Sequence, residues 1–201
     1  MEFSAQALKP LDLYKLMTGA VIPRPIAWVS TQNQLGELNL APFSFFNAVC
    51  ASPPTLMVSV GRREDGQPKD TARNAQTTGE LVINVTTEDV VEAMNATSID
   101  APPGEDEFQL AGLTPVPSKM VAPPRLAESP VSFECRLSQT LAIGGNTLLF
   151  GEIVYLHVRD DVYRPSYKID PLALRPVGRL SGPQYGRMTE VFSLERPKWQ
   201  E

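Results

Sequence analysis

The chain is poor in the residues that most often build metal centres and catalytic triads. It has a single histidine, His157, and two cysteines, Cys50 and Cys135, among 201 residues. The cysteines match no metal-ligand spacing, so a zinc site is disfavoured and we expect two small hydrophobic side chains in a reducing compartment. A Ser-His-Asp triad would have to use His157, which lies within a strand pattern, so we expect that histidine to be structural.

Positive charge is scarce as well. The formal net charge is −5, whereas nucleic-acid-binding proteins normally carry a basic excess that neutralises phosphate groups. An anionic ligand would therefore be held by a few local cations. No apolar run is long enough to span a membrane, and the first residues lack the basic and apolar regions of a signal peptide. We expect a cytoplasmic protein that binds neither nucleic acid nor membrane.

Three well-known motifs are missing. No Gly-x-Gly-x-x-Gly segment and no Walker loop occurs, which argues against Rossmann and P-loop nucleotide binding. No Gly-x-Ser-x-Gly segment occurs either, so the nucleophile elbow of α/β-hydrolases is absent from the sequence. The function must therefore come from a different arrangement of residues.

Proline, by contrast, is abundant, with 19 residues. Such density disfavours a helical bundle and favours short strands joined by shaped loops. Strict alternation of apolar and polar residues is clearest over 131–138. The expected strands are 26–31, 38–43, 55–60, 81–85, 131–138 and 147–158; the expected helices are one turn at 12–17, a helix after Asp70 that ends near Thr78, and a helix capped by Thr86 and Asp89 that ends near Asn95.

This pattern predicts a mainly β protein with short helices. We find no internal repeat and no linker, so residues 1–201 are expected to form one domain. Several short strands with two short helices are typical of a closed or partly closed antiparallel barrel.

A candidate anion site precedes the helix expected after Asp70. Unpaired backbone N–H groups and the helix dipole favour negative charge at a helix start. Lys69 and Arg62 add positive charge and Thr71 adds a hydroxyl donor, so a terminal phosphate fits. On this segment alone, a simple helix cap with solvated cations is the favoured interpretation.

A second candidate site follows the strand expected at 38–43, where the chain enters an aromatic-rich turn. Pro42 removes a ladder donor, so the strand is expected to bend or to meet an edge. The backbone of 44–47 and the Asn47 amide offer donors and acceptors to the edge of a flat heterocycle, with Phe45 and Phe46 beside it. An aromatic core plug is the more common role for such residues.

Taken together, these segments resemble the flavin-reductase-like family of FMN-binding split barrels. The family includes flavoredoxin-like proteins and reductase components of two-component monooxygenases. Weaker similarity continues through 151–160 and 179–185, although this chain has Leu180-Ser181-Gly182 where family members often show two glycines. The resemblance is carried by five segments in fixed order, 22–31 with Pro23-Arg24-Pro25, 39–47, 52–54, 61–63 and 69–71.

The resemblance implies an antiparallel split barrel that forms a homodimer, with FMN near the subunit interface. The turn residues would meet the flavin ring or ribityl chain, and Arg62, Lys69 and Thr71 would hold the phosphate. Arg179 and Tyr185 would approach the flavin, either from the same chain or from the partner chain. The implied cofactor-binding residues are Arg24, Ser30, Pro42, Ser44, Phe45, Phe46, Asn47, Arg62, Lys69, Thr71, Arg179 and Tyr185.

In such a site the cofactor carries the chemistry. NADH or NADPH would stack on the flavin and pass hydride to N5, so no essential catalytic side chain and no metal are expected. The electrons would then reach oxygen, free flavin, a metal ion or a partner monooxygenase. Two rival functions stay open: an electron-transfer flavoprotein reduced by another protein, and a non-enzymatic barrel that binds a small ligand or haem.

Overall fold

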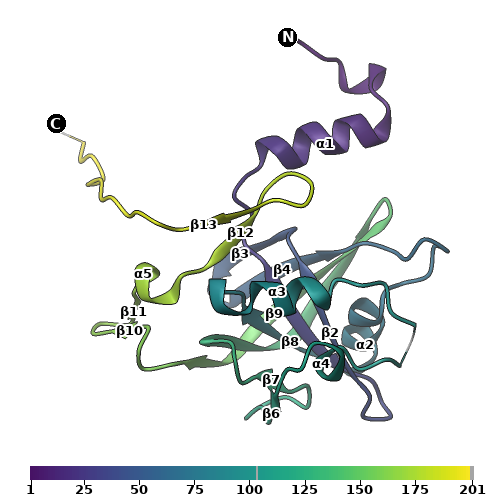
Figure 1. Ribbon diagram of the computed structural model, residues 1–201, viewed down its shortest axis with the longest axis vertical. Coiled ribbons are helices and arrows are strands. Elements are labelled where there is room, and N and C mark those ends of the chain that lie inside the picture. Colours follow the sequence, from purple (N-terminus) through teal and green to yellow (C-terminus); the bar gives the residue numbers. More distant parts are fainter. Residues whose placement is uncertain (103, 200–201) are drawn as a thin grey trace.

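The computed structural model describes residues 1–102 and 104–199, and its centre is one seven-stranded antiparallel sheet (Figure 1). The order of strands across the sheet is β2-β1-β5-β8-β9-β4-β3. The strands are β1 (Ala27–Gln32), β2 (Leu38–Phe43), β3 (Phe46–Ala51), β4 (Pro54–Val60), β5 (Glu80–Val85), β8 (Val131–Ile143) and β9 (Asn146–Val158).

The two edge strands of this sheet, β2 and β3, are consecutive in the chain. Only Ser44 and Phe45 lie between them, so the sheet has to curl until its edges meet. The Ser59 amide donates to the Phe45 carbonyl at 2.8 Å and ties this connection to β4. The result is a barrel that is split between β2 and β3, as predicted.

Short elements cover the barrel. Three two-stranded ribbons are β6 (Pro115–Val116) with β7 (Arg125–Leu126), β10 (Tyr163–Arg164) with β11 (Lys168–Ile169), and β12 (Val177–Arg179) with β13 (Tyr185–Arg187). The helices are η1 (Ala5–Ala7), α1 (Pro10–Ala20), α2 (Asp70–Thr78), η2 (Glu88–Val90), α3 (Val91–Ala96), α4 (Glu107–Leu110) and α5 (Pro171–Leu174). None of the helices in the described ranges is long and apolar enough to cross a membrane.

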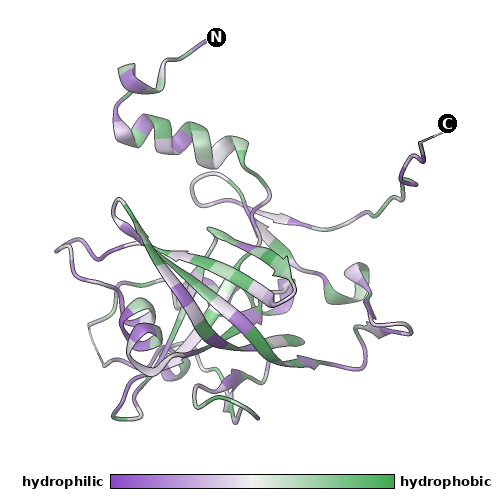
Figure 2. Ribbon diagram, turned by 180° about the vertical axis from the view of Figure 1, so that it is seen from behind, coloured by the Kyte–Doolittle hydropathy of each residue, from purple (hydrophilic) through white to green (hydrophobic). Residues whose placement is uncertain are grey.

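Hydrophobic and hydrophilic residues alternate along the strands (Figure 2), and the buried hydrophobic residues form two clusters. One side of β1 packs inside the barrel, where Ala27 and Val29 meet Ala72 and Ala75 of α2. Outside the barrel, Trp28 of β1 and Leu40 of β2 pack against Met94 of α3 and Phe108 of α4. Trp28 is fully buried, and its indole N–H donates to the Thr97 hydroxyl at 2.9 Å. Burial of a side chain of this size fixes the helices on that face.

The predicted strands are confirmed, and five details differ. Thr86 and Asp89 form no capping box, because the N-cap of η2 is Thr87 and no side chain caps that turn. Helix α1 is a full helix rather than one turn at 12–17. Phe46 and Asn47, which were predicted to lie in an irregular turn at 44–47, begin the edge strand β3. Strand β8 continues past 138 to Ile143. Lys69 rather than Asp70 is the N-cap of α2, because the Asp70 carboxylate in the first turn pairs with Arg63 and Arg73.

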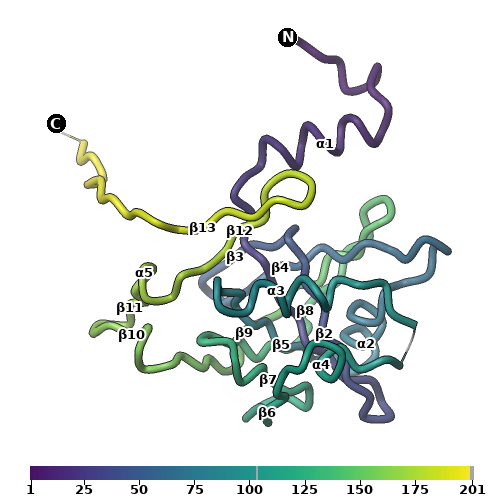
Figure 3. The backbone as a smooth tube through the Cα atoms, viewed as in Figure 1, coloured from purple at the N-terminus to yellow at the C-terminus, as the bar shows by residue number. Residues whose placement is uncertain are grey.

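Both ends of the chain project from the barrel (Figures 1 and 3). Helix α1 and the tail after β13 extend away from the sheet. Along α1, Leu11, Tyr14 and Leu16 remain 62 %, 52 % and 45 % exposed, and Phe192 in the tail is 79 % exposed. An isolated helix of this length is marginal in water, so these segments need a further surface to pack against.

Candidate functional site

Arg24 stands at the centre of the candidate site. Its backbone bridges to Arg179 of β12, and its side chain is only 7 % exposed. The guanidinium donates to the carbonyls of Thr18 (2.6 Å) and Val21 (2.7 Å) at the end of α1, and to the Leu180 carbonyl (2.8 Å). A cation that satisfies the last carbonyls of a helix also opposes its dipole. Arg24 therefore anchors α1 and the β12–β13 ribbon to the barrel.

Three pockets have Arg24 in their lining, and two of them contain most of the predicted cofactor residues. The first, here called the ribbon pocket, has a volume of about 440 Å³ and lies between α1, α3 and the β12–β13 ribbon. The second, here called the edge pocket, has a volume of about 410 Å³ and lies between α1 and β3. Predicted cofactor residues in the ribbon pocket are Arg24, Pro42, Ser44, Arg179 and Tyr185; those in the edge pocket are Arg24, Ser44, Phe45, Phe46 and Asn47.

The predicted ring-binding residues thus come together although they are far apart in sequence. Ser44 lines both pockets, and its hydroxyl lies 3.4 Å from the Arg24 Nε. The Arg24 guanidinium stands 5.9 Å from the centre of the Phe45 ring. Asn47 uses its Oδ1 to accept from the Ala48 amide at 2.8 Å. The carboxamide nitrogen of Asn47 is the part of that side chain left to meet a ligand.

Arg179 and Tyr185 are held by a chain of hydrogen bonds. The Arg179 guanidinium donates to the Tyr185 hydroxyl and to the Gly182 carbonyl (2.6 Å), and it lies 4.7 Å from the centre of the Tyr185 ring. The Tyr185 hydroxyl donates to Asn95 Oδ1 at 2.9 Å. Asn95 also lines the ribbon pocket. It was not among the predicted residues, because nothing in its local sequence distinguishes it from an exposed residue at a helix end.

The predicted phosphate residues gather at the start of α2. Lys69 Nζ pairs with Asp100 at 3.0 Å, and this hydrogen bond holds the pKa of the Asp100 carboxyl below its usual range. Thr71 is 1 % exposed, and its hydroxyl oxygen accepts from the Asn39 amide at 3.0 Å. Arg62 donates to the Gly66 carbonyl at 3.0 Å. The three residues share one end of the barrel but lie outside both pockets.

Strand β2 connects this cluster with the ring residues. Asn39, which contacts Thr71, and Pro42, which lines the ribbon pocket, lie on the same strand. At ~3.4 Å per residue they are ~10 Å apart. One continuous strand therefore spans the two halves of the predicted cofactor site.

Ser30 is placed differently from the other predicted residues. It is fully buried, and its hydroxyl donates to the Pro124 carbonyl at 2.5 Å. The Asn84 amide lies 3.5 Å from the same hydroxyl. Ser30 lines neither pocket, so we leave it out of the site proposed below and assign it to the packing of the 118–124 segment.

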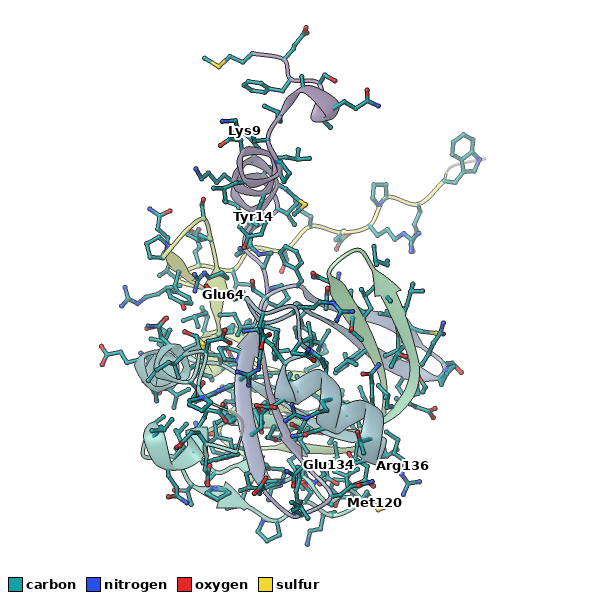
Figure 4. All side chains as sticks on the ribbon, turned by 90° about the vertical axis from the view of Figure 1, so that its right-hand side faces the viewer. Lys9, Tyr14, Glu64, Met120, Glu134 and Arg136 are labelled. Carbon is teal, nitrogen blue, oxygen red and sulfur yellow. The ribbon has the colours of Figure 1, made fainter. Side chains whose placement is uncertain are left out.

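Two buried carboxylates support the barrel away from the pockets. Glu107 accepts a hydrogen bond from the Leu40 amide at 2.9 Å, so a backbone group of edge strand β2 has a partner. Burial raises the pKa of the Glu107 carboxyl. Glu134 accepts from the amides of Lys119 (2.7 Å) and Met120 (2.6 Å) and lies 2.5 Å from His157 Nε2. Figure 4 shows Glu134 and Met120 at the end of the molecule opposite Tyr14 of α1.

The pKa of Glu134 reflects opposing effects. Burial acts to raise it, and the hydrogen bonds from His157 and the two amides outweigh burial, so the pKa lies below its usual range. Cys135 is buried beside Glu134, and burial raises the pKa of its thiol to about 12. A thiol in that state is a weak nucleophile at neutral pH, which agrees with the expectation of a small hydrophobic side chain.

Comparison with known proteins identifies the family. Residues 18–175 match the model of the flavin reductase like domain. A protein of Halalkalibacterium halodurans is 47 % identical over 98 % of this chain and 97 % of its own length. Nitrilotriacetate monooxygenase component B from Bacillus cereus superposes with a TM-score of 0.93 at 38 % identity, covering 96 % of this chain and 98 % of that one.

A second solved structure has a different reaction in its name. The 2-nitrobenzoate 2-nitroreductase NbaA of Pseudomonas fluorescens superposes with a TM-score of 0.91 at 30 % identity, covering 100 % of this chain and 98 % of that one. A Shewanella frigidimarina protein whose structure is described as having a split barrel domain superposes with a TM-score of 0.86 at 24 % identity, covering 98 % of this chain and 100 % of that one. The chain therefore belongs to the flavin reductase-like family, with its split-barrel fold and its flavin-binding, reductase-type oxidoreductase function.

Proposed function

We propose that this protein binds FMN across the groove around Arg24 and reduces it with NADH or NADPH. The observation that carries the proposal is the convergence of separate segments on one place: Arg24, the turn after β2, and the β12–β13 ribbon all line the two joined pockets. Strand β2 then leads from these pockets to the cations at the start of α2.

The residues suit the two chemically different ends of FMN. A flat ring fits along the turn, where Phe45 and Phe46 supply apolar contacts and Ser44 and Asn47 supply polar groups. A phosphate fits at the start of α2, where the first backbone N–H groups have no partner within the helix and where Lys69 and Thr71 are the N-cap and a first-turn residue, with Arg62 on the preceding loop. We propose Lys69, Arg62 and Thr71 as the phosphate ligands.

Bound FMN supplies the redox chemistry, since its ring accepts hydride from a nicotinamide. The protein binds and orients both partners and leaves one face of the ring open. None of its side chains has to transfer a proton, so the pockets need hydrogen-bond donors and apolar walls rather than an acid and a base.

We further propose that the protein is a homodimer of one-domain chains in the cytoplasm. The apolar residues of α1 and the strand β3 are exposed in the single chain. An unpaired edge strand and an unsupported helix both favour association with another surface. Sedimentation at micromolar concentration tests this, and a monomer under those conditions would remove the dimer from the proposal.

The recipient of the electrons is proposed from the comparison. One similar protein is component B of nitrilotriacetate monooxygenase, so we propose a partner monooxygenase as the acceptor of reduced flavin. Consumption of oxygen by a candidate monooxygenase, with and without this protein, measures that transfer.

The decisive experiment is an absorption spectrum of the purified protein before and after anaerobic addition of NADH or NADPH. Loss of the oxidised flavin band on addition of either nucleotide supports the proposal. A colourless protein that does not bind added FMN would favour the non-enzymatic barrel. A yellow protein that neither nucleotide reduces would favour an electron-transfer flavoprotein reduced by another protein.

A further inference from the structure

The ribbon pocket has an unusual charge for this chain. The net charge of the protein is −5, yet the pocket is lined by two arginines, Arg24 and Arg179. None of the described residues that line it is acidic. The other lining groups that can hydrogen-bond include the hydroxyls of Tyr14 and Ser98. A pocket with this lining attracts an anion.

The two arginines differ in what they can offer an anion. A guanidinium has five N–H donors. Arg24 directs its donors to three backbone carbonyls and toward the Ser44 hydroxyl, so most of them are used. Arg179 makes two hydrogen bonds, to Tyr185 and Gly182. Arg179 therefore keeps three N–H groups for a ligand, and Arg24 contributes mainly its charge.

The orientation of Arg179 is fixed before any ligand binds. The Tyr185 hydroxyl accepts from the guanidinium and donates to Asn95 Oδ1, so a β-ribbon and α3 hold the same group. The guanidinium also stacks over the Tyr185 ring. A planar fork held in place binds phosphate oxygens in pairs and loses little side-chain entropy on binding.

We propose that Arg179 binds the pyrophosphate group of NADH or NADPH in the ribbon pocket, with Tyr185 and Asn95 as positioning residues. This inference rests on the proposed function. The FMN phosphate is assigned to the start of α2, which lies outside the pocket, so the ribbon pocket is left for a second anion. Pro42 and Ser44 line the same pocket, which places that anion beside the turn proposed to hold the flavin ring.

The test is anaerobic stopped-flow reduction of the FMN-loaded protein at increasing nicotinamide concentration. Arg179→Gln should raise the nicotinamide concentration at half-maximal rate about 10- to 100-fold, the loss expected for a charge-assisted hydrogen bond. The limiting rate of reduction should change by less than about 2-fold, because hydride transfer does not involve Arg179. Any loss of FMN affinity should be smaller than the loss of nicotinamide affinity and equal for FMN and riboflavin, because the phosphate of FMN is proposed to bind at the start of α2. Arg164→Gln, a surface arginine paired with Asp170, is the matched control.

Two further measurements test whether the pocket binds pyrophosphate and whether Tyr185 positions Arg179. Inorganic pyrophosphate should compete with the nicotinamide in the parent protein and lose affinity in Arg179→Gln. Tyr185→Phe keeps the aromatic ring and removes the hydroxyl, so it should raise the half-maximal concentration several-fold while the limiting rate holds. A merely structural role for Tyr185 would alter thermal stability and leave that concentration unchanged.

The outcomes separate this inference from the proposed function. Weaker binding of FMN but not of riboflavin in Arg179→Gln, with unchanged nicotinamide dependence, would assign the pocket to the flavin phosphate and overturn the inference. A lower limiting rate at unchanged half-maximal concentration would overturn it as well. A parent protein that binds FMN and that neither nucleotide reduces would overturn the proposed function and this inference together.

Discussion

Replacing Lys69 with alanine separates the two ends of the cofactor, because FMN carries a phosphate and riboflavin does not. Lys69 Nζ is 3.0 Å from Asp100, and the two side chains are 32 % and 48 % exposed. The ammonium group therefore has a partner already, and a phosphate must compete with the Asp100 carboxylate for it.

The expected magnitude follows from these two contacts. A charge-assisted hydrogen bond to phosphate contributes about 1.5–3 kcal/mol, and an exposed ion pair such as Lys69–Asp100 is worth about 0.2–1 kcal/mol. The difference is about 0.5–2.8 kcal/mol, which corresponds to about 2- to 100-fold weaker FMN binding in Lys69→Ala. Riboflavin affinity should not change.

Asp100→Asn provides the reciprocal test. It removes the competing carboxylate, so FMN should bind up to about 5-fold more tightly. The gain should shrink when Lys69 is alanine, since the competition acts through that residue. Fluorescence titration of apoprotein with FMN and riboflavin gives all the affinities, and Arg164→Ala controls for the loss of a remote positive charge.

Equal losses of affinity for FMN and riboflavin would refute this account, because they would show that Lys69 supports the fold of the site rather than the phosphate. An Asp100→Asn variant that binds FMN more weakly would refute the competition between phosphate and carboxylate.

Three other substitutions test the stability of the fold and the structural role of the histidine. The pKa of Glu134 is lowered in the folded protein. The stabilisation that the Glu134 carboxylate contributes is therefore fully present above its unfolded pKa and is lost as pH falls through its folded pKa. The urea midpoint of unfolding should thus fall more steeply on acidification in the parent protein than in Glu134→Gln. A Cβ at Gly178 would lie 2.6 Å from Pro23 Cβ, so Gly178→Ala should cost about 1–3 kcal/mol of unfolding free energy, whereas Gly145→Ala, with no neighbouring atom within 4 Å, should be nearly neutral. His157→Gln should change flavin reduction less than about 3-fold, because a general acid or base would contribute about 10²–10⁴-fold; a hundredfold slower rate with flavin bound would contradict a structural histidine.

Local patterns predicted the barrel well where burial is one-sided. The β-branched residues of β4 correspond to a strand with one face in the core. Alternation along β8 also located a strand, although Ser132 and Glu134 on its polar face are buried as well. Strand β3 escaped prediction because it is an edge strand and its residues after Phe46 are exposed, so no alternation of polarity is required of it. Helix α1 was predicted too short because its apolar residues do not pack on the chain's own core.

The site was predictable only in part, for a similar reason. Ser44, Phe45 and Asn47 are neighbours in sequence, and their spacing alone carries information about a turn. Asn95 reaches the ribbon pocket through a hydrogen bond to Tyr185, ninety positions away. Arg24 lines both pockets, and nothing in the sequence indicated that its hydrogen bonds go to backbone carbonyls of α1 and Leu180. Contacts of this range depend on the closed fold and leave no local signal.

The turn between β2 and β3 lies at the split of the barrel. No hydrogen-bonded ladder joins these two strands in the described sheet, and Ser44 and Phe45 connect them across the split. Arg24 holds α1 and the β12–β13 ribbon on either side of that split, which creates a pocket on each side instead of a covered seam. The split between β2 and β3 therefore lies beside the two pockets in which we propose that the flavin ring binds.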